Sequence, residues 1–192
     1  MVWFAVGLFA LLLIAIGVGA YCVSIYNGLV GVKHQVEQAW SNIDVLLRQR
    51  HDELPKLIDV VKSYGAYERD LLEKVTTLRA RAGSGREPDA SRLAAEDDLS
   101  RAVGRLLVTA EAYPDLKAST TYLDLQRRIS TLEEQIAHRR EYYNDAVNLN
   151  NVRTEQFPDM LLAPMAGLHR APLFTATAEE KADIDVGGRL RG

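Results

Sequence analysis

The side chains of this chain that could bind a metal are its histidines and acidic residues, and their spacing does not fit a metal site. Helical bundles hold paired metal ions with inward glutamates joined by Glu-x-x-His pairs. The chain has no such pair, because Glu134 and His138 are four residues apart and His34 precedes Glu37 in the reverse order. We therefore expect no metal and no other cofactor.

The sequence also lacks the residue patterns of an enzyme or a nucleic-acid-binding protein. No nucleophile stands in a recognisable arrangement with a base, and no glycine-rich loop could cradle a phosphate. The single cysteine excludes an internal disulfide and a cysteine-rich metal site. A net charge of −3 provides no basic field for nucleic acid. We predict that the chain is not an enzyme and does not bind nucleic acid.

Two arginines stand where a bundle would bury them. Arg139 and Arg140 lie on or beside an apolar helical stripe, between Ile136 and Tyr143, and a buried unpaired charge is costly. Asp44 and Asp52, and also Glu111, are their candidate acceptors. The predicted buried polar network comprises Asp44, His51, Asp52, Arg139 and Arg140. Such a network would set helix register, and the alternative is a ligand pocket.

His51 lies near the centre of the apolar stripe of the first helical pattern. We interpret it as a half-buried hydrogen-bonding residue. The alternative is a pH-responsive switch, which imidazole chemistry allows but for which the sequence offers no partner.

A second group of candidate residues lies in a turn. Proline fixes φ and aspartate can cap the helix that follows, so the sequence Tyr-Pro-Asp-Leu-Lys is mostly turn chemistry. Function concentrates in loops on rigid scaffolds, which makes this corner a candidate for partner binding. The predicted interaction corner comprises Glu111, Tyr113, Pro114, Asp115 and Lys117.

The element that must position all of these residues is an N-terminal membrane span. Residues 1–25 are almost entirely apolar, and the first charge is Lys33. At about 1.5 Å per residue, roughly 20 apolar residues cross a bilayer core of about 30 Å. Trp3, Tyr21 and Tyr26 bracket the run, as aromatic residues do at the two interfaces. A cleaved signal peptide is the alternative, but it would need a basic segment before the apolar run.

The distribution of Lys and Arg predicts the orientation of the span. None precedes it, whereas Lys33, Arg48, Arg50 and Lys56 follow it. Positive residues favour the cytoplasmic side. We expect a single-pass protein with its C-terminal domain in the cytoplasm.

The rest of the chain is predicted to be all-α, because no segment alternates apolar and polar residues as a half-buried strand does. Residues 26–158 contain apolar positions at helical spacing, with Trp40 among the expected core residues. Pro55 should kink the first helix or restart it with Asp52 as the cap. If unbroken, that helix could extend to Arg81.

Two further helices complete the predicted fold. A loop at residues 83–89 precedes a helix that ends near Tyr113, with Asp89 or Ser91 as its cap. The last helix should extend from about Ser119 to Gln156. The N-terminal transmembrane helix is thus followed by a long-helix, up-and-down antiparallel helical bundle. Residues 159–174 form an apolar extension that packs on the bundle or on the membrane, and residues 175–192 are predicted to be disordered.

The chain resembles the LemA family of bacterial single-span proteins in two blocks of residues. The first runs from Tyr26-Asn27-Gly28-Leu29-Val30 through Arg50-His51-Asp52 to Tyr64, and the second begins with Glu-Ala-Tyr-Pro-Asp-Leu-Lys-Ala at 111–118 and ends at Phe157-Pro158. The resemblance implies a helical bundle and an anchor in the bacterial inner membrane. It implies no settled biochemical activity.

These observations predict a membrane-anchored scaffold or adaptor that contacts other proteins or copies of itself. One alternative is a sensor or accessory subunit that binds a small ligand or metal through Asp44, His51, Arg139 and Arg140. A further alternative is a self-assembling protein that shapes the membrane.

Overall fold

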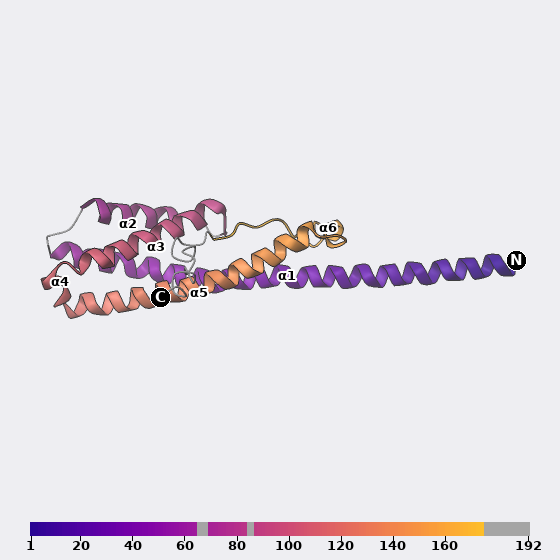
Figure 1. Ribbon diagram of the computed structural model, residues 1–192, viewed down its shortest axis with the longest axis horizontal. Coiled ribbons are helices and arrows are strands. Elements are labelled where there is room, and N and C mark those ends of the chain that lie inside the picture. The colour runs from indigo at the N-terminus through magenta and orange to yellow at the C-terminus, as the bar shows by residue number, and fades with distance from the viewer. Residues whose placement is uncertain (65–68, 84–86, 175–192) are drawn as a thin grey trace, which may run out of the picture. The chain divides into compact units, whose positions relative to one another are not determined.

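The computed structural model describes residues 1–64, 69–83 and 87–174, and within these ranges it contains helices and no strand (Figure 1). The predicted all-α fold is confirmed. The helices are α1 (Val2–Ser63), α2 (Arg69–Ala82), α3 (Ala90–Ala110), α4 (Pro114–Lys117), α5 (Thr120–Glu155) and α6 (Asp159–Leu162).

The chain divides into two compact units, and both long helices contribute to each of them. The anchor unit comprises Met1–Asp44 and His138–Ala171. The four-helix unit comprises Val45–Ala137 and Pro172–Gly192. The first part of α1 and the last part of α5 thus belong to the anchor unit, and the rest of both helices belongs to the four-helix unit.

The four-helix unit is an up-and-down bundle of the end of α1, α2, α3 and the start of α5, which alternate in direction (Figure 1). Their apolar residues recur every three or four positions and therefore share one helix face. The buried core comprises Leu54, Leu57, Ile58, Val61, Leu72, Val75, Leu78, Ala82, Ala95, Leu99, Ala102, Val103, Leu106, Ala110, Leu116, Tyr122, Leu125 and Ile129.

The first helix of this unit does not break at Pro55, where the sequence predicted a kink or a restart. Helix α1 continues through Pro55 to Ser63, so the expected restart with Asp52 as a cap is wrong. Helix α2 begins at Arg69, so an unbroken helix to Arg81 is also wrong. Proline costs about 3 kcal/mol inside a helix. Leu54 and Leu57 flank it and are fully buried, and such packing stabilises helices more than propensity does.

The ends of α3 and α5 carry side-chain caps. Asp89 caps α3, because its carboxylate accepts a hydrogen bond from the Arg92 backbone N–H at 2.7 Å. At α5 the Ser119 hydroxyl accepts from the Tyr122 backbone N–H at 3.3 Å. The predicted capping role of Asp115 is wrong, because this residue lies inside the single turn of α4. The bounds predicted for α5 differ from the structure by one residue at each end.

The anchor unit begins with the apolar part of α1. This part is long and apolar enough to cross a membrane, and its most apolar stretch is not buried within the described structure. Trp3, Tyr21 and their apolar neighbours are exposed to the surroundings. Farther along α1, Trp40 is only half-buried, and its ring lies 5.6 Å from that of Tyr143 on α5.

Residues 159–171, which we call the strap, fold back from α5 onto α1 (Figure 1). Its buried residues and those of α1 make one apolar cluster: Ile25, Leu29, Val32, Ala163, Ala166 and Leu168. Two asparagines of α5 fix its far end. Asn150 donates to the His169 carbonyl at 2.8 Å, while Asn151 donates to the Ala171 carbonyl at 3.0 Å and accepts from its N–H at 2.9 Å.

Two predictions concern residues without a structural description. The tail expected to be disordered, 175–192, lies outside the described residues. So does the centre of the predicted loop at 83–89.

Candidate functional site

The guanidinium of Arg50 on α1 is a fully buried charged group of the four-helix unit. Its side chain is fully buried, in line with the apolar residues Leu47 and Leu54. Nη1 donates to Glu133 at 2.9 and 3.1 Å and to the Ser100 hydroxyl at 2.6 Å. Nη2 donates to Glu96. One arginine therefore links α1 to α3 and α5.

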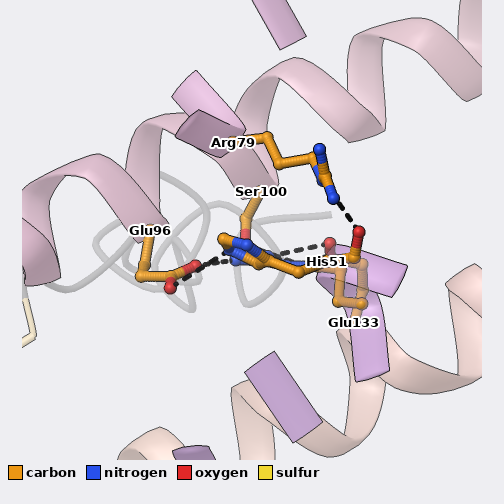
Figure 2. A network of polar contacts seen from close by, with 6 residues as sticks. His51, Arg79, Glu96, Ser100 and Glu133 are labelled. Atoms are coloured by element: carbon orange, nitrogen blue, oxygen red, sulfur yellow. Dashed lines mark hydrogen bonds and ion pairs between the residues drawn. The ribbon is translucent and has the colours of Figure 1, made fainter. Parts of the chain in front are cut away.

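Other contacts close this cluster around the arginine (Figure 2). Ser100 donates its hydroxyl to Glu133 at 2.8 Å. His51 Nε2 lies 3.5 Å from Glu96 Oε1, and the His51 carbonyl accepts from Arg79 Nε of α2 at 2.8 Å. The cluster therefore includes residues from every helix of the four-helix unit apart from the short α4.

A glycine provides the room for the His51 ring. A Cβ added at Gly83 would lie 3.2 Å from both Cε1 and Nδ1 of His51, which is tighter than most such contacts. Gly83 follows α2 directly. The small residue allows the end of α2 to approach the imidazole.

The electrostatics of the cluster favour a charged Glu96. Burial of this carboxyl raises its pKa, but the contact with His51 and the positive charge of Arg50 outweigh burial, so the pKa of Glu96 is lower than usual. The carboxylates of Glu96 and Glu133 both accept charge-assisted hydrogen bonds from the guanidinium of Arg50. Such an arrangement fixes the register of three helices.

The structure separates the residues of the predicted buried polar network. His51 alone joins the cluster around Arg50. Asp44 and Arg140 are buried, and both belong to the anchor unit. Arg139 has an exposed side chain and so does not need a buried acceptor, and Asp52, one of its predicted acceptors, is exposed as well.

Sequence reasoning missed the residues that form the cluster with His51: Arg50, Glu96, Ser100 and Glu133. A pattern that could have found them was present. Arg50 is three residues after Leu47 and four before Leu54, and Glu96 is three residues after Leu93 and three before Leu99. Charges of opposite sign at stripe positions of two helices are candidates for a buried pair.

Two hollows are lined by some of the residues predicted to bind a ligand. In the anchor unit, a hollow of about 340 Å³ is lined by Arg139 and Tyr142 of α5 and by Gln35, Gln38 and Asn42 of α1. In the four-helix unit, a hollow of about 300 Å³ is lined by His51 and Asp52 with Arg48, Arg92 and Glu96. Arg139 and His51 thus line different hollows, and Asp44 and Arg140 line neither of these two. Among the described residues, no group of three or more His, Cys, Asp or Glu side chains could hold a metal ion.

The predicted interaction corner is a packed turn with a charged outer face. Leu116 is buried and belongs to the core, and Tyr113 is half-buried against it. Pro114 occupies the first position of α4, where proline is favoured. The side chains exposed at this corner are those of Glu111, Pro114, Asp115 and Lys117.

Comparison with known proteins now adds to this geometry. The sequence profile of the LemA family matches residues 39–187. The chain belongs to the LemA family. The resemblance seen in the sequence is thereby confirmed, and the match covers the cluster around Arg50 as well as the interaction corner.

Curated relatives agree with the LemA assignment. Protein LemA of Metamycoplasma hominis is 28% identical over 160 residues, which cover 83% of this chain and 73% of the relative. Magnetosome protein MamQ 2 of Paramagnetospirillum magneticum is 25% identical over 175 residues, covering 78% of this chain and 64% of the relative. Magnetosome protein MamQ of Magnetospirillum gryphiswaldense is 23% identical over the same shares. This LemA family chain thus spans less than two thirds of the MamQ proteins.

Proposed function

We propose that this LemA family chain is a non-catalytic, membrane-anchored scaffold or adaptor that presents a helical surface to other proteins or to copies of itself. The observation that carries the proposal is the continuity of α1. The exposed apolar run continues without a break into the part of the same helix that packs against α5 and the strap. Such a helix would join the packed part of the anchor unit directly to the span.

The buried charges support a structural role over a catalytic one. The carboxylates of Glu96 and Glu133 bind Arg50 and Ser100. A general base needs access to a substrate proton. Arg50 and Glu96 have no exposed side-chain surface, which favours their use in fixing helix register.

We place the four-helix unit in the cytoplasm, with α1 crossing the bacterial inner membrane once. The support is the basic residues that follow the span, namely Lys33, Arg48, Arg50 and Lys56. The magnetosome names of the MamQ relatives favour a part in a larger cellular structure.

The partner surface that we propose is the interaction corner around Lys117. Its side chains are charged and exposed, and they stand on a turn that Leu116 holds against the core. Charge at the rim of an interface sets partner choice and association rate.

Photocrosslinking in bacterial membranes tests this function. A photoreactive residue replaces Lys117 in the full chain, and the matched control carries it at Lys74, an exposed lysine on α2. We expect a reproducible product at Lys117, either a foreign protein or a second copy, and little at Lys74. Absence of any product from both positions, with normal incorporation and membrane localisation, would contradict a scaffold.

A further inference from the structure

Several large apolar side chains of the anchor unit are exposed although they lie outside the apolar run of α1. Phe157, just before the strap, is 74% exposed, and Met165 within it is 73% exposed. Met160 and Leu161 of α6 are exposed as well. Large apolar groups that gather on a surface mark contact with a membrane or a partner.

The strap separates its apolar residues onto two sides. Ala163, Ala166 and Leu168 are buried against α1. Pro164 follows Met160 by four residues, and Met165 follows Leu161 by four residues, so in a helical turn each pair lies on one side. All four side chains are exposed and point away from the buried side. One side of the strap is thus occupied by α1 and the other is open.

A helix cap holds the strap in this orientation. The Leu168 N–H donates to the Ala163 carbonyl at 2.9 Å and the Gly167 N–H to the Pro164 carbonyl at 3.1 Å. Gly167 has a φ of 73°, so these bonds form a Schellman motif with glycine in the left-handed position. The motif turns Leu168 inward onto the cluster that contains Ala163.

The contact with α1 fixes how far from the membrane span the strap lies. Its partners are Ile25, at the end of the apolar run, and Leu29 and Val32, which are about 6 and 10 Å farther along the helix at 1.5 Å per residue. The headgroup layer adds about 5–8 Å to each side of the hydrocarbon core. The strap therefore stands at the depth of the lipid headgroups if the apolar run crosses the bilayer.

A cation lies beside this segment. A Cβ added at Gly167 would be 3.3 Å from the Lys33 Nζ, so this ammonium group lies next to the turn that ends the strap. An ammonium group at the membrane surface is attracted to anionic lipid headgroups.

We propose that the outer side of the strap, formed by Met160, Leu161 and Met165 together with Phe157, inserts into the headgroup boundary of the bilayer that α1 crosses. The strap acts as a second membrane contact and clamps the anchor unit at the interface. Interfacial helices bury their apolar side by about 5–10 Å in this layer. The inference rests on the proposed membrane anchor and adds a lipid-binding surface to it.

Depth measurement by fluorescence quenching tests the proposal on the full chain in vesicles of phosphatidylcholine and phosphatidylglycerol. Cys22, the single cysteine, is replaced by alanine, and a new cysteine carries an environment-sensitive NBD label. The probe variants are Met165→Cys and Leu161→Cys. The matched control is Val108→Cys on α3, which is 69% exposed against 73% for Met165. Ile14→Cys in the apolar run reports whether the anchor itself is in lipid.

We expect lipids with a shallow spin label to quench the labels at positions 165 and 161 severalfold more strongly than the label at 108. Aqueous iodide should quench only the label at 108. Iodide quenching at 165 and 161 equal to that at 108 would overturn the proposal. So would shielding from iodide without quenching by lipid, because a second copy or another protein would then cover the strap.

The label at position 14 separates the two possible failures. If lipid quenches it while positions 161 and 165 remain open to iodide, the anchor stands and only the strap inference fails. If lipid does not quench it, the proposed membrane anchor fails, and the strap inference with it.

Discussion

The two units of this protein are stabilised in different ways. The four-helix unit buries apolar residues from each of its helices and encloses a fully buried arginine with its carboxylates. In the anchor unit, α1 and α5 bury Ile43, Tyr143 and Val147. The strap is held by a small apolar cluster with α1 and by polar bonds from Asn150 and Asn151; the buried residues of that cluster are Ile25, Leu29, Val32, Ala163, Ala166 and Leu168. The four-helix unit thus has a broad core, whereas the strap of the anchor unit is held by a short apolar contact and two asparagines.

This difference indicates a division of tasks. A broad core with a buried ionic cluster specifies one arrangement of helices, which suits a surface that must keep its shape. A short segment that is held by few buried contacts opens at a lower free energy than a broad core does. We therefore expect the four-helix unit to be the durable part and the anchor unit to depend on its surroundings.

Loss of Arg50 should have the largest effect. Arg50→Met leaves Glu96 and part of Glu133 buried without their cation, and breaking a buried pair costs about 3–5 kcal/mol. Thermal unfolding of the full chain in detergent micelles, followed by circular dichroism, measures the loss. The control Arg127→Ala removes an exposed pair with Asp124 and should change stability by well under about 1 kcal/mol. Equal effects of the two substitutions would show that the buried cluster does not hold the four-helix unit.

Replacement of Trp40 should have an intermediate effect in the anchor unit. Full burial of a tryptophan would give a loss of about 3–5 kcal/mol on substitution by alanine. Trp40 is half-buried and contacts the ring of Tyr143 at 5.6 Å, so we expect Trp40→Ala to cost about 2 kcal/mol in the same unfolding measurement. Trp40→Phe retains an aromatic contact and should lose less than half of that. A loss too small to measure would remove Trp40 from the packing of α1 on α5.

Two glycines should respond in opposite directions to alanine. Gly167 has a positive φ, so Gly167→Ala should destabilise the strap by about 1–2 kcal/mol. Gly104 lies inside α3 with open space around its Cα, so Gly104→Ala should stabilise by about 0.5–1 kcal/mol. Hydrogen exchange of the amides of Gly167 and Leu168, and of α3, reports the two effects separately. Unchanged exchange of both strap amides in Gly167→Ala would argue against the Schellman turn.

The titration of Glu96 should have the smallest effect on the free energy of unfolding at neutral pH. Its pKa is lower in the folded chain than in the unfolded chain, so the ionised carboxylate adds stability above the unfolded value of about 4.3. That stability is lost as the pH falls through the lower folded pKa. Unfolding measured between about pH 3 and 6 should show this loss, and Glu96→Gln should flatten it. A slope that is the same in both proteins would mean that other carboxylates account for the acid sensitivity.

The helices of this fold could be predicted well from the sequence, because the helical periodicity of apolar residues and the residue composition are local properties of the chain. The bounds of α5 and the cap at Asp89 follow from residues that act within one turn. The break between α1 and α2 was misplaced because the burial of Leu54 and Leu57 outweighs the cost of Pro55. That burial depends on residues distant in the sequence.

The candidate site was harder to predict for the same reason. Arg50 pairs with carboxylates 46 and 83 residues away, and no local rule selects Glu96 and Glu133 over other acidic residues. Arg139 and Arg140 were adjacent in the prediction, yet one is exposed and the other buried, because neighbouring positions of a helix differ by about 100° in direction. The spacing of apolar residues along the helix does not tell which of the two adjacent arginines is buried.

We propose that this LemA family chain assembles with other proteins or with itself at the membrane. The most direct test extracts the full chain from bacterial membranes in polymer nanodiscs, without detergent, and measures the mass of the particles by native mass spectrometry. We expect particles with a fixed number of copies or with a second protein in constant ratio. Particles that contain one copy of the chain and lipid alone would contradict it.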